Sequence, residues 1–69
     1  MSNFDSFMKE VDTCLLSKVG MAANDLSDAP WFDYFTDELE IEAACAYALY
    51  DYNDIPFETL VNIGLGDYI

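Results

Sequence analysis

Carboxylates dominate the side chains that could do chemistry, and they gather in three stretches. The 69 residues hold 14 Asp and Glu against two basic residues and no His, a formal net charge of −12 at pH 7. The densest stretch spans 33–42, the second 51–58 and the third 25–28, and both basic residues, Lys9 and Lys18, come earlier. A folded body this small holds its charges within little more than a Debye length, ~8 Å, so their repulsion costs stability. The imbalance therefore indicates that the anionic surface has a use.

Rows of carboxylates could stand in for the phosphates of a nucleic acid. Along a helix, residues i and i+4 differ by about 6 Å of rise, and duplex DNA places a phosphate about every 3.4 Å along each strand. DNA-binding grooves recognise the backbone by charge and position, so a coarse match suffices. The candidate partner-binding residues are eight acids and two tyrosine anchors, Asp33, Asp37, Glu38, Glu40, Glu42, Asp51, Asp54, Glu58, Tyr47 and Tyr50.

The same acids have a second, purely structural interpretation. Residues 37–42 are expected in the first turns of a helix, where acids complement the dipole, and Asp28 and Asp54 are expected as N-caps. This interpretation does not explain why Lys and Arg, which also favour solubility, are almost absent. Asp51 is the informative case, because we expect it near a helix C-terminus, where an anion is disfavoured.

Catalytic and metal sites find less support in the sequence. Asp51 begins a stretch like a calcium-binding loop, but Pro56 and Asn62 occupy the positions where that loop requires Gly and Glu. No serine has an adjacent base, and without histidine neither a catalytic triad nor a zinc site has its groups. Paired carboxylates would need a pocket that separates their pKa values. We expect no enzyme, no metal site and no cofactor.

The composition predicts a folded protein despite the charge. Hydrophobic residues make up 54% of the chain and aromatic residues 16%, whereas disordered acidic chains lack both. The length predicts one domain over 1–69. Because no apolar run approaches the ~20 residues of a membrane span and the N-terminal residues lack a signal-peptide pattern, we expect a cytoplasmic protein without membrane contact. So small a core leaves apolar surface exposed, so both a monomer and a homodimer remain open.

The first helix is predicted over residues 4–19, where apolar residues recur at three- and four-residue steps. Ser2 or Asn3 can cap its N-terminus, and Gly20 supplies a left-handed stop. The two cysteines, at positions 14 and 45, fall on expected apolar helix faces. This placement favours two buried thiols, while a disulfide between them remains the alternative.

Four aromatic residues within five positions, starting at Trp31, predict a short helical turn at the centre of the core. Trp31 and Phe35 are one turn apart and should point inward together. Core packing is also expected for Tyr34. Tyr47 and Tyr50 remain open between core packing and an interface role.

A further helix is predicted from about 37–40 to near Asn53, with a run of small residues that allows a neighbouring helix to approach closely. Another short helix is expected after Pro56, ending at Gly64. The predicted fold is therefore a compact all-α bundle of three to four short helices.

Over its whole length the chain resembles small inhibitors, encoded by phages and mobile elements, that mimic DNA. The shared features are size, extreme negative charge, aromatic richness and helical make-up, and no single motif carries functional residues over. Within this group the chain is most similar to type I anti-CRISPR proteins. It is also similar in these general features to inhibitors of restriction enzymes and of uracil-DNA glycosylase. The stretch 25–35, followed by an Ala-rich helix, also resembles short phage proteins.

The resemblance implies a non-enzymatic inhibitor in the cytoplasm of a host bacterium. It would block the DNA-binding groove of a Cascade subunit, a basic surface of a host defence complex, without itself binding nucleic acid. The second hypothesis is a small helical adaptor or antitoxin-like regulator, whose protein partner recognises its apolar surface. In that case the acids only keep the protein soluble.

Overall fold

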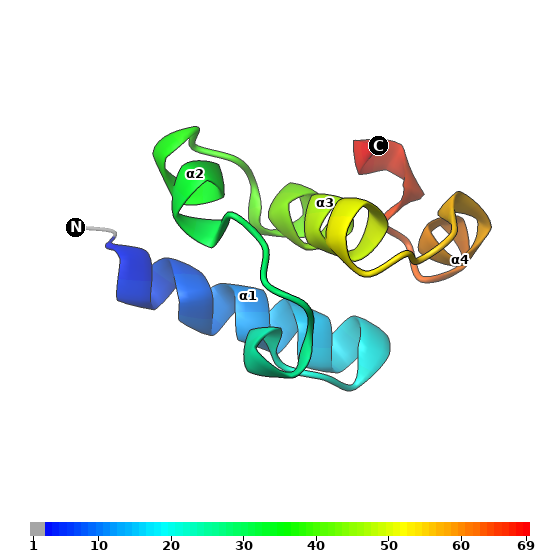
Figure 1. Ribbon diagram of the computed structural model, residues 1–69, viewed down its shortest axis with the longest axis horizontal. Coiled ribbons are helices and arrows are strands. Elements are labelled where there is room, and N and C mark those ends of the chain that lie inside the picture. Colours follow the sequence, from blue (N-terminus) through cyan, green and yellow to red (C-terminus); the bar gives the residue numbers. More distant parts are fainter. Residues whose placement is uncertain (1–2) are drawn as a thin grey trace.

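The computed structural model describes residues 3–69, and they form an all-α protein, as predicted (Figure 1). In this range the elements are α1 (Phe4–Val19), the 3-10 turn η1 (Ala23–Asp25), α2 (Trp31–Thr36), α3 (Ile41–Tyr52), α4 (Phe57–Asn62) and the 3-10 turn η2 (Gly66–Tyr68). No helix among the described residues has the length and apolar character needed to cross a membrane.

Both ends of α1 form as the sequence predicts. The Oδ1 atom of Asn3 accepts a hydrogen bond of 2.8 Å from the backbone N–H of Ser6, so Asn3 is the N-cap. Ser2, the alternative cap, lies outside the described residues. At the other end Gly20 adopts a left-handed φ of 73°, and its N–H donates to carbonyls of the last turn. A left-handed residue at this position lets the chain leave the helix with its carbonyls satisfied.

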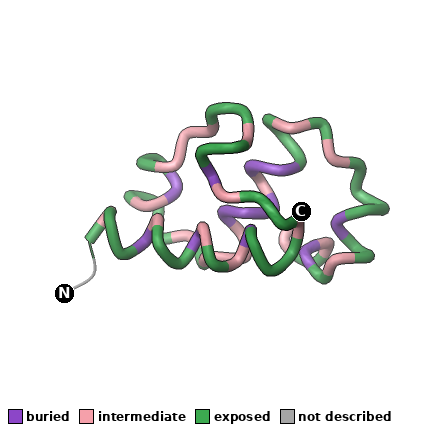
Figure 2. The backbone as a smooth tube through the Cα atoms, turned by 90° about the horizontal axis from the view of Figure 1, so that it is seen from below, coloured by how far each residue is buried: buried purple, intermediate pink, exposed green. Residues whose placement is uncertain are grey.

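The core lies between α1 and α3, and Figure 2 shows buried residues on the sides of the helices that face one another. On α1 the fully buried residues are Val11 and Leu15; on α3 they are Ala44, Cys45, Ala46, Ala48 and Leu49. The small side chains of α3 let the two helices approach closely. The Cys45 Sγ atom accordingly lies only 3.8 Å from the backbone oxygen of Val11. This close packing is what the run of small residues predicts.

The two cysteines have different environments. Both are free thiols, with Cys45 buried and Cys14 half-buried. Burial, and next the neighbouring Cys14 thiol, raises the pKa of Cys45 above its ordinary range. Two buried thiols were expected, and this expectation holds for Cys45 alone.

The aromatic residues of α2 pack less deeply than predicted. Only Tyr34 is buried, whereas Trp31 and Phe35 are half-buried. These two do not form one inward pair: Phe35 packs edge-on against Phe4 and Phe7 of α1, and Trp31 packs edge-on against Tyr34. A helix of six residues lies at the edge of the α1–α3 core and cannot bury all of its rings. Four rings meet where α2 packs on α1, with centroids 5.4–6.3 Å apart: Phe4, Phe7, Phe32 and Phe35.

The predicted start of α3 near 37–40 is right only at its last residue, because Glu40 is the N-cap of α3, whereas Asp37 and Glu38 belong to the end of α2. Glu38 N–H donates to the Phe35 oxygen (3.1 Å), and Leu39 N–H donates to the Tyr34 oxygen (3.2 Å). These two bonds, with a φ of 60° at Glu38, form a Schellman motif in which glycine is the usual residue. The acids at 37–40 therefore occupy the α2–α3 connection, and α3 begins at Ile41.

The predicted N-caps at Asp28 and Asp54 are also wrong. Pro30 and Pro56 take the N-cap positions of α2 and α4, and no side chain caps either helix. Asp54 instead has a left-handed φ of 54° just after α3. There Asn53 ends the helix, donating from Nδ2 to the Ala48 oxygen at 2.9 Å.

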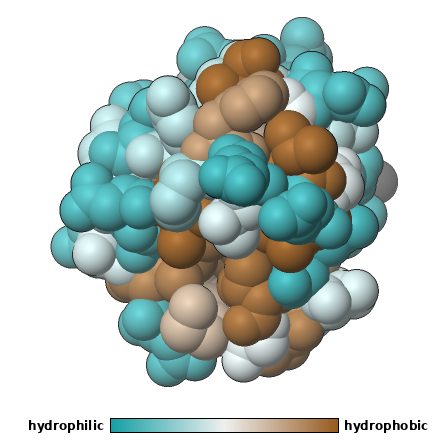
Figure 3. All heavy atoms as spheres, turned by 90° about the vertical axis from the view of Figure 1, so that its right-hand side faces the viewer, coloured by the Kyte–Doolittle hydropathy of each residue, from teal (hydrophilic) through white to brown (hydrophobic). Residues whose placement is uncertain are grey.

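The C-terminal elements α4 and η2 pack against each other and against α3. Leu60 of α4 and Leu65 before η2 are fully buried, and Gly64, just after the end of α4, has a left-handed φ of 87°. In contrast, Phe57 and Val61 are 47% and 53% exposed. Figure 3 shows this end of the molecule, where hydrophobic side chains reach the surface between hydrophilic ones.

Leu15 and Leu16 provide a matched test of the core, since Leu15 is fully buried and Leu16 is 54% exposed. We expect Leu15→Ala to lower the free energy of unfolding by about 2–5 kcal/mol, because it leaves a cavity between α1 and α3. Leu16→Ala should change it by about 0.5 kcal/mol or less. Urea denaturation followed by helical circular dichroism measures both, and equal losses would contradict this packing.

Candidate partner-binding surface

None of the ten predicted binding residues lies in the core. Glu42 and Tyr47 are half-buried and the other eight are exposed. They do not form two rows along one helix, however, because only four of them lie on α3, and the acids among these four are at its opposite ends. Glu42 is in its first turn and Asp51 in its last, about 13 Å apart along the axis. The structure thus divides the predicted residues between the two ends of α3.

At the first end, residues distant in sequence gather around the C-terminal turn. The pKa of Tyr68 is raised, first by partial burial and then by the nearby carboxylates of Glu42, Glu40 and Asp67. Glu40 and Glu42 were predicted as binding residues, whereas Asp67 was not. Asp67 is isolated in the sequence, and only the return of η2 onto α3 brings it to this group.

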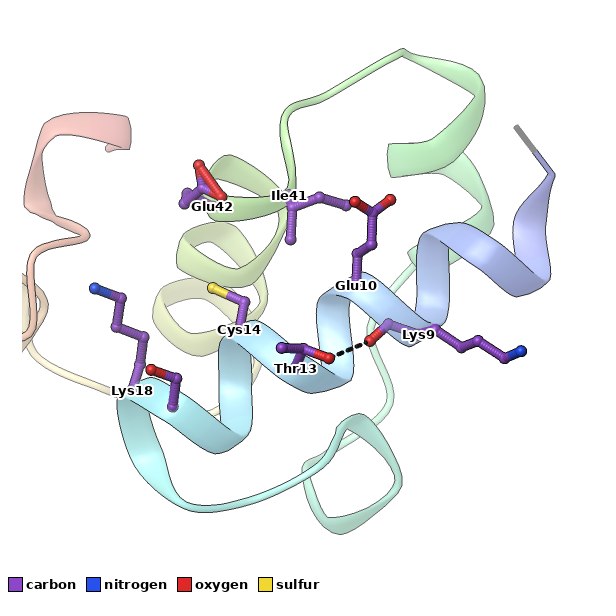
Figure 4. A pocket seen from close by; sticks show the side chains of 8 residues that line it. Lys9, Glu10, Thr13, Cys14, Lys18, Ile41 and Glu42 are labelled. Atoms are coloured by element: carbon purple, nitrogen blue, oxygen red, sulfur yellow. Dashed lines mark hydrogen bonds between the residues drawn. The ribbon is translucent and has the colours of Figure 1, made fainter. Parts of the chain in front are cut away.

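Two shallow grooves extend this acidic region across α1. One, of ≈ 530 Å³, lies between α1 and the start of α3 (Figure 4). Its lining residues are Lys9, Glu10, Thr13, Cys14, Ser17, Lys18, Ile41 and Glu42. The other is lined by residues of α1, α2 and the α2–α3 connection, among them Glu10 and Glu38. Glu10 borders both grooves, so it connects carboxylates that the sequence places far apart.

We call this region the acidic face, defined by Glu10, Glu38, Glu40, Glu42 and Asp67. Glu10 was not predicted, because its neighbours on α1 are of mixed charge and no dense acidic stretch marks it. Figure 4 shows the carboxylate of Glu10 beside Ile41, and the side chain of Lys9 pointing away from the groove. Lys18 lies at the other end of the groove.

At the second end of α3 the acids meet tyrosines. The pKa of Tyr34 is raised to about 12, first by burial and then by electrostatic interaction with Tyr52, Asp51 and Tyr47. The Trp31 and Tyr34 ring centroids are 5.7 Å apart at 87°, and those of Tyr34 and Tyr47 are 6.3 Å apart at 38°. These five residues are called the tyrosine cluster. Core packing was expected for Tyr34 and is confirmed.

Three of the predicted residues at this end stand apart from the tyrosine cluster. Tyr50 is 41% exposed and therefore does not pack in the core. Asp54 lies in the α3–α4 connection, and Glu58 in the first turn of α4. Asp33 and Asp37 stay exposed on α2 and at its end. These positions leave the charges accessible to a partner.

The chemistry available to this surface is that of exposed anions and aromatic rings. Among residues 3–69, no group of three or more His, Cys, Asp or Glu is placed to hold a metal ion. The described core contains no buried charged or polar residue. Comparison of the chain with protein families, curated proteins and solved structures finds no match.

The raised pKa of Tyr34 makes stability depend on alkaline pH. The ordinary pKa is 10.0 and the folded value about 12, so the unfolded chain loses this proton first as pH rises. Stability that is fully present below pH 10 is therefore lost through this window, by about 1 kcal/mol near pH 11. Tyr34→Phe should remove this part of the loss. Urea titrations of both proteins at about pH 9 and pH 11 measure it, and parallel losses would contradict the assignment.

Glu38 tests whether a charge is retained at the expense of stability. Glu38→Gly should raise the free energy of unfolding by up to about 1 kcal/mol, because glycine adopts a left-handed φ without strain. Glu38→Gln removes the same charge and keeps the strain, so it should gain less. Urea denaturation compares the two, and a glycine variant no more stable than the glutamine variant would argue against strain at this position.

Proposed function

We propose that this protein is a stoichiometric, non-enzymatic inhibitor that occupies a Lys/Arg-lined nucleic-acid groove on its target. One observation carries the proposal: after Lys18 the chain has eleven carboxylates and no cation, and the fold exposes or half-buries every one of them. Solubility alone does not require this, since Lys and Arg would serve equally well. The first candidate target is the DNA-binding groove of a type I Cascade subunit.

Backbone strain supports a functional role for two of these acids. Among the described residues, Glu38 and Asp54 are the two non-glycine residues with positive φ. Such conformations cost about 1–2 kcal/mol for ordinary residues. Strained positions often occur where a side chain is required for binding. Both residues were predicted to bind a partner from their charge alone.

The inhibitor acts by replacing phosphates with carboxylates in the target's groove. A Lys/Arg-lined groove attracts polyanions and holds water and small anions, and salt screens this attraction, so affinity falls as salt rises. The carboxylates would take the same positions and displace the same water and anions. The protein would therefore compete with DNA and bind the target without binding DNA itself.

An adaptor is the second candidate, favoured by the apolar surface near α4. Phe57 and Val61 are about half-exposed there, and Figure 3 shows hydrophobic side chains reaching this face. A partner that recognises this surface would depend on these two residues. It would also tolerate changes on the acidic face.

The decisive experiment is a competition gel shift with purified type I Cascade complexes and labelled target duplex. The wild-type protein in slight excess should abolish the DNA shift and form a stable complex with Cascade. Glu38→Lys with Glu42→Lys should weaken this binding by about two orders of magnitude or more, because each reversal places a cation against the basic groove. Affinity should also fall as salt rises from low to physiological concentration.

Two controls separate charge placement from total charge and from apolar docking. Asp5→Lys with Asp28→Lys changes the net charge equally, at exposed positions away from the acidic face, and should cost only a few-fold. Phe57→Ser with Val61→Ser should leave the competition intact. An unaffected DNA shift would exclude Cascade as the target. The adaptor would be favoured if only the α4 variant lost binding to the target, or if the affinity did not change with salt concentration.

A further inference from the structure

Asp51 occupies a position where its charge is uncompensated. It lies in the last turn of α3, which contains no basic residue. The C-terminus of a helix carries about half a negative charge, so a carboxylate there raises the energy of the folded state. Nothing later than Lys18 in the sequence can neutralise it, and Asp54 adds a further anion just after the helix. This end of α3 therefore carries two anions and no basic residue of its own.

Aromatic rings surround the same position. Tyr47 and Asp51 are one helical turn apart on α3, so their side chains are neighbours. The Tyr34 ring packs against both Trp31 and Tyr47, and Asp51 and Tyr52 act on its hydroxyl through space. The burial is graded, from buried Tyr34 through half-buried Trp31 and Tyr47 to exposed Tyr52 and Asp51. The tyrosine cluster thus opens to solvent at its carboxylate.

We propose that the tyrosine cluster receives an arginine side chain of the protein partner. A guanidinium group stacks on aromatic faces, keeps its charge when desolvated and pairs with a carboxylate through two parallel hydrogen bonds. The cluster offers both features together, because Tyr47 lies one helical turn from Asp51 and the Tyr34 ring packs against both Tyr47 and Trp31. The inference rests on the proposed function, in that the partner presents a basic groove, and it adds a contact separate from the acidic face.

Charge selects a basic partner over a second copy of this chain. A second copy would bring another twelve net negative charges, and its two cations both lie on α1. Neither copy could supply a guanidinium group, because Lys9 and Lys18 are its only basic residues. A Lys/Arg-lined groove supplies what this end of α3 lacks.

Hexa-arginine and hexa-lysine peptides test the inference, because they carry equal charge and differ in their ability to stack. Trp31 is the sole tryptophan and belongs to the cluster, so its fluorescence reports binding directly. We expect hexa-arginine to bind about tenfold more tightly than hexa-lysine and to change the Trp31 emission. Equal affinities, or an unchanged Trp31 signal on binding, would overturn the proposal.

Matched variants locate the contact. Asp51→Asn and Tyr52→Leu should each weaken hexa-arginine about five- to tenfold and reduce its advantage over hexa-lysine. The controls are Asp5→Asn on α1 and Phe57→Leu on α4, which lie outside both surfaces; Asp5 is exposed, and Phe57 is about as exposed as Tyr52, at 47% against 44%. Each control should cost about twofold or less with either peptide. All four positions are exposed, so helical content should stay unchanged. Equal effects of variants and controls would overturn the proposal.

The outcomes for the two proposals are distinguishable. If the peptides show no arginine preference while Glu38→Lys with Glu42→Lys still abolishes Cascade binding, the proposed function stands and the arginine contact is wrong. If the arginine preference depends on Asp51 and Tyr52 but Cascade is not bound, the contact is supported and the proposed target is wrong.

Discussion

The close contact between α1 and α3 is the constraint on which the rest of the structure depends. A chain with a net charge of −12 can stay folded only if its small core is dense enough to outweigh the repulsion. Ala44, Cys45 and Ala48 allow this density, because they are small and fully buried and the Cys45 Sγ atom lies 3.8 Å from the backbone oxygen of Val11 on α1. The other elements are short and pack around this pair. The charges consequently remain outside, on connections and helix ends.

Those connections are where structure and charge conflict. Helix α2 ends in a Schellman motif and α3 ends before a left-handed residue, and glycine would suit both positions. The chain has Glu38 and Asp54 there instead. The fold therefore accepts backbone strain and charge repulsion together at two exposed positions. This combination is easier to explain if both carboxylates meet a partner than if they only solvate the surface.

The aromatic residues divide into two groups with different roles. Four of the five phenylalanines join α2 to α1 through ring contacts and contain no polar atoms, so they serve packing. The tyrosine cluster lies toward the C-terminal end of α3 and is exposed at Tyr52 and Asp51, whereas Tyr34 is buried. A basic groove would meet carboxylates on the acidic face and both rings and a carboxylate at the tyrosine cluster. Such a pairing of charge with rigid aromatic anchors is typical of interfaces with high specificity.

Local patterns in the sequence were enough to predict the helical class, the span and caps of α1 and the close approach at Ala44 and Cys45. These features depend on neighbours within a few positions, because capping and helical periodicity act over one or two turns. The same reasoning misplaced the start of α3, since acids at 37–40 suit a helix N-terminus as well as the end of α2. Hydrogen bonds from Glu38 and Leu39 back into α2 decided between these alternatives.

The sequence by itself determined that the surface is anionic and that some aromatic residues lie near its acids. Only the tertiary structure decided which carboxylates meet. Glu10 borders the same grooves as Glu38 and Glu42, and Asp67 reaches Glu40 through Tyr68, although tens of residues separate some of these positions. The physical reason is that charge is a property of each side chain, whereas its neighbours across helices depend on how the whole core packs.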